Sequence, residues 1–179
     1  MNIHTLVKDV LYRLGQVRQQ LGFVTPLSHE DYREVEHWLS ATALALFRTM
    51  SMADQRHSLR VCLALQARGC KEHDMLAAAL LHDVGKAEGR VPFWTRPVIV
   101  LGKRLHPAWL RRVTVAPELI DHAKIPRWQR ELSYAWWHAE VGAQLAERAG
   151  LSEQAILYIR THHLPQGPAA ELYVVDEVS

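Results

Sequence analysis

The chain has 179 residues, 49% of them hydrophobic and 22% charged, with a formal net charge of +2. This length fits one globular domain, and so low a net charge points to no particular class of partner. The first residues form a mixed amphipathic stretch, and no apolar run approaches the roughly 20 residues that span a bilayer, so we predict neither a signal peptide nor a membrane span. Cys62 and Cys70 form no metal-binding motif, and we expect them to be reduced, largely buried residues of a cytoplasmic protein.

Apolar residues recur at helical spacing along most of the chain, and alternating β-branched runs are almost absent. The sequence therefore predicts an all-α fold, with breaks at Gly and Pro. Ser28 is the expected N-cap of the second helix and Asp54 that of the third, Gly85 is expected to end the fourth, and Ser152 to begin the sixth. In chain order, helices are predicted over residues 4–21, 28–50, 54–67, 72–83, 133–150, 152–163 and 169–178.

Residues 88–132 differ in composition from the rest of the chain. They contain five prolines, and residues 86–130 carry ten Lys or Arg but only three acids, together with Trp94, Trp109 and Trp128. We interpret this segment as a basic, Trp/Pro-rich insertion or lid between two halves of a single domain, 1–179. In this division residues 1–53 are N-terminal helices, and residues 54–87 and 133–178 form the functional core.

A series of histidines and aspartates lies at the edges of the predicted apolar helix faces. In AAALLHDVGK (77–86) an apolar run leads directly to His82 and Asp83, and a buried aspartate needs a cation or several hydrogen-bond donors. One such histidine is more often a hydrogen-bonded core residue, but this many predict a metal site. Histidine and carboxylate ligands without thiolate suit Fe, Mn, Ni, Co or Zn, and the chemistry does not choose among them. The full series is His57, His82, Asp83, His138, His162, His163 and Asp176.

This series resembles that of the HD superfamily of metal-dependent phosphohydrolases. HDVGK is similar to the family's H-D-[IV]-G-K form, and HAEVGAQLAERAGLSEQAILYIRTHH resembles its second half, so that the resemblance covers roughly residues 54–178. It implies an HD-domain helical bundle and a dinuclear centre of two divalent transition metal ions, often iron. One ion would be held by His57, His82, Asp83 and Asp176, and Asp83 would bridge to a second ion held by His138, His162 and His163.

The resemblance also implies hydrolysis of a phosphate ester or anhydride by a metal-activated hydroxide, with a small phosphorylated substrate that we expect to be a nucleotide. Asp83 and Lys86 are the expected catalytic residues, and Lys86, Arg56 and His163 the expected substrate contacts. Each has a plainer alternative. Lys86 can stabilise the helix dipole, Arg56 can be solvated, and His163 can be a metal ligand only.

The insertion leaves the substrate open. Its tryptophans and cations suit a nucleotide, or a peripheral contact with an anionic membrane through residues 92–112, or a lid whose charges are solvated. Specific nucleic-acid binding is not expected. The chain lacks the G-Y-P pattern of cyclic-di-GMP phosphodiesterases and resembles more the symmetrical dinucleoside-tetraphosphate hydrolases and HDIG-type proteins of bacteria. Two other functions remain open: a di-iron HD-type oxygenase, and a non-catalytic metal-binding sensor or membrane-associated module. The sequence sets neither the metal nor the oligomeric state.

Overall fold

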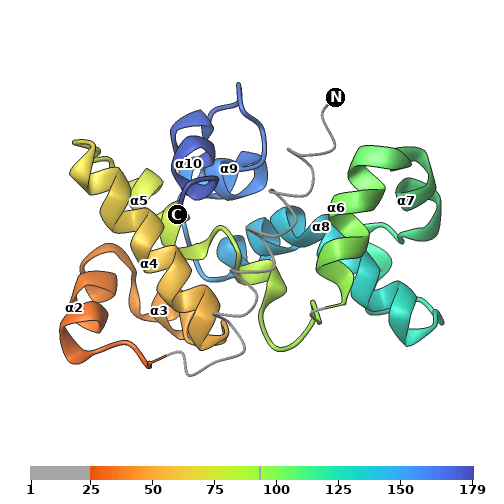
Figure 1. Cartoon of the computed structure of the whole chain (residues 1–179). Helices are drawn as coiled ribbons and strands as arrows, with labels where there is room; N and C mark the ends of the chain where they lie inside the picture. The colour runs from red at the N-terminus through yellow and green to blue at the C-terminus, as the bar shows by residue number, and fades with distance from the viewer. Residues whose placement is uncertain (1–24, 93) are drawn as a thin grey trace.

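The computed structural model describes residues 25–92 and 94–179, with only the backbone at 96, 103 and 104. Within these ranges the chain forms helices and no strand, so the prediction of an all-α fold is confirmed (Figure 1). The helix predicted over residues 4–21 lies outside the described residues. The α-helices are α2 (His29–Trp38), α3 (Ala41–Phe47), α4 (Met52–Ala67), α5 (His73–Leu81), α6 (Thr95–Leu105), α7 (Pro107–Val113), α8 (Arg127–Arg148), α9 (Glu153–Thr161) and α10 (Ala170–Asp176), with 3-10 helices η1 (Val84–Lys86) and η2 (Pro117–Leu119).

The main hydrophobic core joins α2–α5 to the C-terminal helices. α4 packs on α5 and on α10. α5 also packs on α9, so α5 lies between α4 and α9 and is covered on both sides. This explains why α5 is apolar all round, with every residue from Met75 to Leu81 buried. Leu65, Leu76 and Ile159 are fully inaccessible in this core.

Three helix boundaries differ from the predicted ones. The single helix predicted over 28–50 is two helices, because Leu39 is extended and Ser40 begins α3 by accepting a hydrogen bond from the Ala43 amide. Asp54 is not the cap of α4. Ser51 is, and Asp54 lies in the first turn, where its carboxylate accepts from the Ser51 hydroxyl. α8 begins at Arg127 rather than at 133, so it extends into the segment predicted as an insertion.

The fourth predicted helix also ends differently. α5 stops at Leu81, and a 3-10 turn follows through Lys86, so Gly85 is not the residue that ends it. Gly85 instead allows close packing on α8, since a Cβ there would lie 2.0 Å from the carbonyl oxygen of His138. The first residue of α9 follows the predicted Ser152 cap, and the ends of α9 and α10 agree with prediction to within two residues.

α6 and α7 form a helical hairpin at one end of the molecule, away from α2 and α3 (Figure 1). A small second core holds the hairpin on the N-terminal half of α8 and includes Ile99, Leu110 and Leu132. Gly102 allows the close approach of the two hairpin helices, because a Cβ there would lie 2.7 Å from a Leu110 methyl. Among the described residues, no helix is long and apolar enough to cross a membrane.

Candidate metal centre

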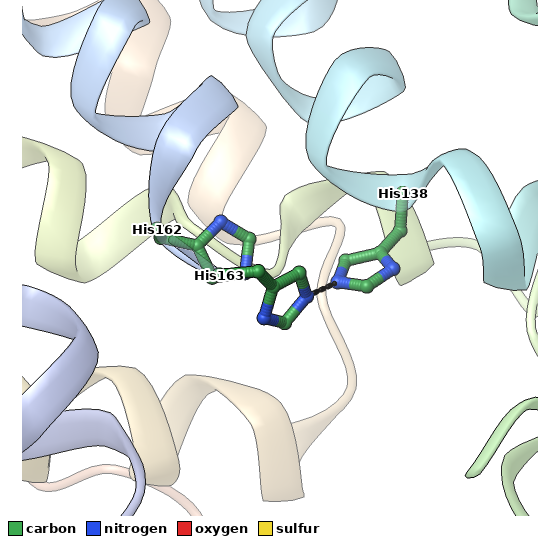
Figure 2. Close-up of side chains that lie close together, drawn as sticks. All are labelled: His138, His162 and His163. Carbon is green, nitrogen blue, oxygen red and sulfur yellow. Dashed lines mark hydrogen bonds between the residues drawn. The ribbon is translucent and has the colours of Figure 1, made fainter. Parts of the chain in front are cut away.

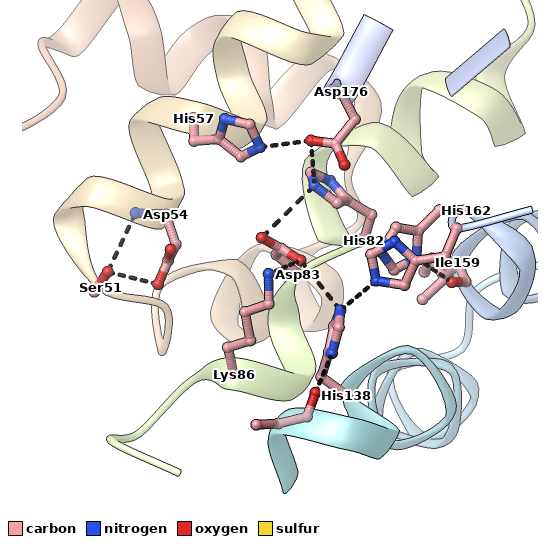
Figure 3. Close-up of polar contacts among 12 residues, drawn as sticks. Ser51, Asp54, His57, His82, Asp83, Lys86, His138, Ile159, His162 and Asp176 are labelled. Carbon is pink, nitrogen blue, oxygen red and sulfur yellow. Dashed lines mark hydrogen bonds and ion pairs between the residues drawn. The ribbon is translucent and has the colours of Figure 1, made fainter. Parts of the chain in front are cut away.

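Four of the predicted ligands come together where α4, α5 and α10 meet (Figure 3). His57 lies in the second turn of α4, His82 and Asp83 directly follow α5, and Asp176 is the last residue of α10. The Nε2 atom of His57 lies 2.8 Å from Oδ1 of Asp176, and Nε2 of His82 lies 3.5 Å from the same oxygen. His57, His82 and Asp83 offer ligand atoms all within 4.8 Å of one another, as a metal ion requires.

A second group of three histidines lies beside the first. His138 comes from the middle of α8, while His162 and His163 follow the last residue of α9, and the three side chains point toward one another (Figure 2). Their ligand atoms also lie within 4.8 Å of one another. The Nε2 atoms of His138 and His163 are 2.8 Å apart. His138 and His162 are buried, whereas His163 is exposed, so this group opens toward solvent at His163.

Asp83 lies between the two groups. One carboxylate oxygen is 3.8 Å from Nε2 of His82, and the other is 3.8 Å from Nε2 of His138. The Asp83 side chain is 8% exposed, and the Lys86 ammonium lies 2.6 Å from its Oδ1. Asp83 is therefore placed so that its two oxygens face different histidine groups.

Three of the five histidines are oriented by the same backbone interaction. Nδ1 of His82 faces the carbonyl oxygen of Ala79 at 2.8 Å, Nδ1 of His138 that of Ala135 at 2.9 Å, and Nδ1 of His162 that of Ile159 at 2.7 Å. A carbonyl oxygen only accepts, so each Nδ1 carries a proton and Nε2 is the ring nitrogen that can face a metal ion, after loss of its own proton in the case of His82. Hydrogen bonding of this kind at the other ring nitrogen is usual for histidines that ligate metals.

The buried ring nitrogens test whether these residues fit a metal. Nε2 of His82 and Nε2 of His162 are buried and have no hydrogen-bond partner, although carboxylate oxygens lie near the former. A buried polar atom without a partner is rare in proteins and costs about 1–3 kcal/mol. A cation would satisfy both nitrogens, and the imidazole and carboxylate donors suit a divalent transition metal. The residues therefore fit metal ions, in two groups that share Asp83.

The protonation of these side chains follows from burial and from neighbouring charge. Burial holds the pKa values of His138 and His162 well below the usual range. Burial also disfavours protonated His82, but Asp83 and Asp176 outweigh it and raise the pKa of His82 to about 9. Despite burial, Lys86 and the neighbouring histidines hold the pKa of Asp83 well below its usual range, and the contact with His57 does the same for Asp176. Both carboxylates are therefore ionised, as metal ligands must be.

The predicted substrate contacts lie in different surroundings. Lys86 is partly exposed and borders the cluster through Asp83, as its predicted role requires. Arg56 instead donates to the backbone carbonyl oxygens of Thr25 and Pro26, 2.8 Å from the latter. Its guanidinium therefore holds the segment before α2, and its role in substrate binding stays a prediction.

A cavity of about 260 Å³ lies along the N-terminal half of α8. Tyr134, which borders it, is one helical turn before His138 on the same face of α8. Arg90 packs over the Tyr134 ring with 5.7 Å between the guanidinium carbon and the ring centroid. The lining residues are Glu88, Gly89, Arg90, Arg127, Arg130, Glu131 and Tyr134.

The structure brings the seven residues predicted as ligands into one cluster, but sequence reasoning missed the groups that orient three of them. The carbonyl oxygens of Ala79, Ala135 and Ile159 have no side-chain signature, although each belongs to the residue three before a histidine. Comparison of the chain with protein-family models, with curated proteins and with solved structures finds no match in any of the three.

Proposed function

We propose that this chain is a metal-dependent phosphohydrolase of the HD type that cleaves a phosphate ester or anhydride. The observation that carries the proposal is the pair of ligand groups, His57–His82–Asp83 and His138–His162–His163, with the Asp83 carboxylate between them. Two adjacent sites that share a carboxylate are typical of centres that act on phosphoryl groups. The resemblance of the same residues, as a sequence series, to that of the HD phosphohydrolases also supports this proposal.

The first ion would be held by His57, His82, Asp83 and Asp176, and the second by Asp83 and the three histidines of the other group. Bound there, the ions would act as Lewis acids toward a phosphoryl group and activate water as the nucleophile at neutral pH. The chain needs no Ser or Cys nucleophile in such a reaction. The nature of the metal is not part of the proposal, although iron is consistent with the ligand set.

The side chains of the site would prepare this reaction by orientation and charge. The Nδ1 bonds of His82, His138 and His162 hold their rings in place before any ligand arrives. Lys86 carries a positive charge on a flexible stem at the partly exposed border of the cluster, where it can pair with a phosphate oxygen. His163 is exposed beside His138 and can either complete the second site or donate to the same phosphate.

The surroundings of the site favour a nucleotide as substrate. The cavity on α8 combines an aromatic ring with three arginines, and although Glu88 and Glu131 pair with two of these, guanidinium groups bind phosphate well. Because Tyr134 lies one helical turn from His138 on α8, we propose that the part of the substrate beyond the phosphate extends toward this cavity.

Metal analysis combined with a phosphoester and nucleotide screen tests the proposal, on protein purified without chelator. We expect about two metal ions per chain and turnover that Asp83→Asn abolishes. His29→Ala is the matched control, because His29 is exposed and lies outside the cluster. Metal-free wild-type protein without activity in the screen would overturn the proposal. O2 uptake with a mixed-valence di-iron signal and no phosphoester turnover would overturn it in favour of an oxygenase.

A further inference from the structure

The α6–α7 hairpin exposes an unusual number of large apolar side chains. Of the twelve large hydrophobic residues that are exposed among the described ones, five lie between Trp94, the N-cap of α6, and Trp109 of α7. Leu105 is 63% exposed and Trp109 is 47% exposed, although both belong to a hairpin whose own core buries Ile99 and Leu110. Exposed apolar residues scattered singly are normal, but a local concentration marks an interaction surface.

Helix geometry places several of these side chains on one face. With 100° per residue, Trp94, Leu101 and Leu105 fall within about 40° of one another around α6, and the buried Ile99 lies on the other side. The Trp94 indole donates to Glu131 of α8 at 3.1 Å, and Trp128 lies one turn before Glu131 on that helix. The outward face of α6 is therefore a leucine stripe with a tryptophan at its N-terminal end.

The same segment is strongly basic. Between residues 89 and 117 the chain has no Asp or Glu and six Lys or Arg, although the whole chain is almost neutral. Arg111 and Arg112 follow Trp109 on α7, and both are exposed. A helix surface that combines exposed Leu and Trp with Arg or Lys has the composition of an element that lies in the interface of an anionic bilayer.

We propose that the α6–α7 hairpin docks this protein on an anionic lipid surface, with Leu101, Leu105 and Trp109 entering the headgroup region and Arg111 and Arg112 pairing with lipid phosphates. The positive charge of residues 89–117 favours an anionic lipid surface over two other partners, a second copy of the chain and a nucleic acid. A second copy of the chain would bring two acid-free basic segments together, and like charges across an interface are unfavourable. A nucleic acid would use the arginines but leave the leucine stripe in water. This proposal does not depend on the proposed hydrolase activity.

Flotation of the full-length protein with vesicles tests the proposal. We expect binding to phosphatidylcholine vesicles that contain phosphatidylglycerol, weak binding to phosphatidylcholine alone, and release as salt concentration rises. Leu101→Ser with Leu105→Ser removes the stripe and is expected to abolish flotation. Arg111→Gln with Arg112→Gln is expected to lower the partition coefficient for anionic vesicles by about 25-fold, because each basic residue near the surface raises that coefficient roughly fivefold.

Matched controls are available on other surfaces. Leu63→Ser changes an exposed leucine of α4, and Arg68→Gln with Arg148→Gln removes the same charge at the ends of α4 and α8. Both should float as the wild type does, and circular dichroism and metal content should be unchanged in all variants. Equal flotation of the stripe variant and the wild type would overturn the proposal. The proposal would also be overturned if the protein did not bind vesicles and instead formed a dimer that the stripe variant dissociates. The same holds if the protein did not bind vesicles and instead bound nucleic acid, with the arginine variant binding more weakly.

Discussion

Replacement of Gly85 by alanine is expected to damage both the fold and the metal centre. A Cβ at this position would lie 2.0 Å from the carbonyl oxygen of His138 and 2.9 Å from the amide nitrogen of Gly142. An ordinary carbon–oxygen contact is about 3.3 Å or longer, so η1 and α8 would have to separate by roughly 1 Å. The obstructing atoms are backbone and cannot rotate away. We therefore expect a loss of about 3 kcal/mol in the free energy of unfolding, at the upper end for overpacked sites.

The same displacement reaches the ligands. Asp83 lies two residues before Gly85, and the blocked carbonyl belongs to His138 itself, so the 3.8 Å separation of these two side chains would grow. Metal affinity should fall about 10- to 100-fold, as it does when groups that orient ligands are lost. Urea denaturation of chelator-treated protein measures the loss in the free energy of unfolding, and metal titration by calorimetry measures the loss of metal affinity.

Gly142→Ala is the matched control, because Gly142 lies on the other side of the same contact. Its Cβ would lie 3.3 Å from the Gly85 amide nitrogen and 3.4 Å from an Ile159 methyl, so small shifts suffice. The gain of about 1 kcal/mol in helix propensity within α8 offsets that strain, so we expect nearly unchanged stability. If Gly85→Ala and Gly142→Ala show the same urea midpoint and the same metal affinity, the close packing of η1 on α8 does not position the site.

Three other predictions concern separate parts of the molecule. Because carboxylates raise the pKa of His82 to about 9, its contribution to the stability of metal-free protein is fully present below the unfolded pKa and is lost as pH rises through 9. The free energies of unfolding from urea denaturation at pH 6.5 and pH 9 should therefore differ by roughly 2.5 kcal/mol, and equal values would contradict this reasoning. Burial raises the pKa of the Cys62 thiol to about 12. A thiol reagent at pH 8 should therefore label Cys70 in the native protein and Cys62 only after unfolding. Mass spectrometry of the peptides measures the labelling, and native protein labelled at Cys62 would contradict this reasoning. Ser51→Ala removes the hydrogen bond to the Asp54 amide and should cost about 1 kcal/mol, measured by thermal unfolding, with Ser179→Ala as a control expected to change little.

The described helices outside residues 88–132 were predictable because their apolar spacing is regular, but their ends were not, and no helix was predicted where α6 and α7 lie. Ser51 and Asp54 are both strong capping residues three positions apart, and the sequence cannot tell which begins the helix and which supports it. The break at Leu39–Ser40 was hidden because apolar residues continue at helical spacing on both sides. In the fold α2 packs on α5 whereas α3 packs on α8, and Ser40 caps α3 where the two helices separate.

The candidate ligands could be chosen from the sequence because each lies at the edge of an apolar helix face, where a polar side chain is expected to point inward. The contacts of Arg56 could not be predicted in this way. Arg56 lies next to His57 in sequence, but its partners are two backbone carbonyl oxygens about 30 residues away. Every residue has a backbone carbonyl group, so the side-chain pattern of the sequence does not indicate which one accepts. The close approach at Gly85 was also unpredictable, since a glycine after an apolar helix is more often a terminator than a contact.

The contact between His57 and Asp176 spans 119 residues of chain. Closing so long a loop has a large entropic cost that contacts within the helices cannot repay locally, so this pair is expected to form late in folding. During synthesis, the first ligand group remains incomplete until nearly the whole described chain has left the ribosome. An ion that binds there would stabilise the assembled bundle rather than guide its formation.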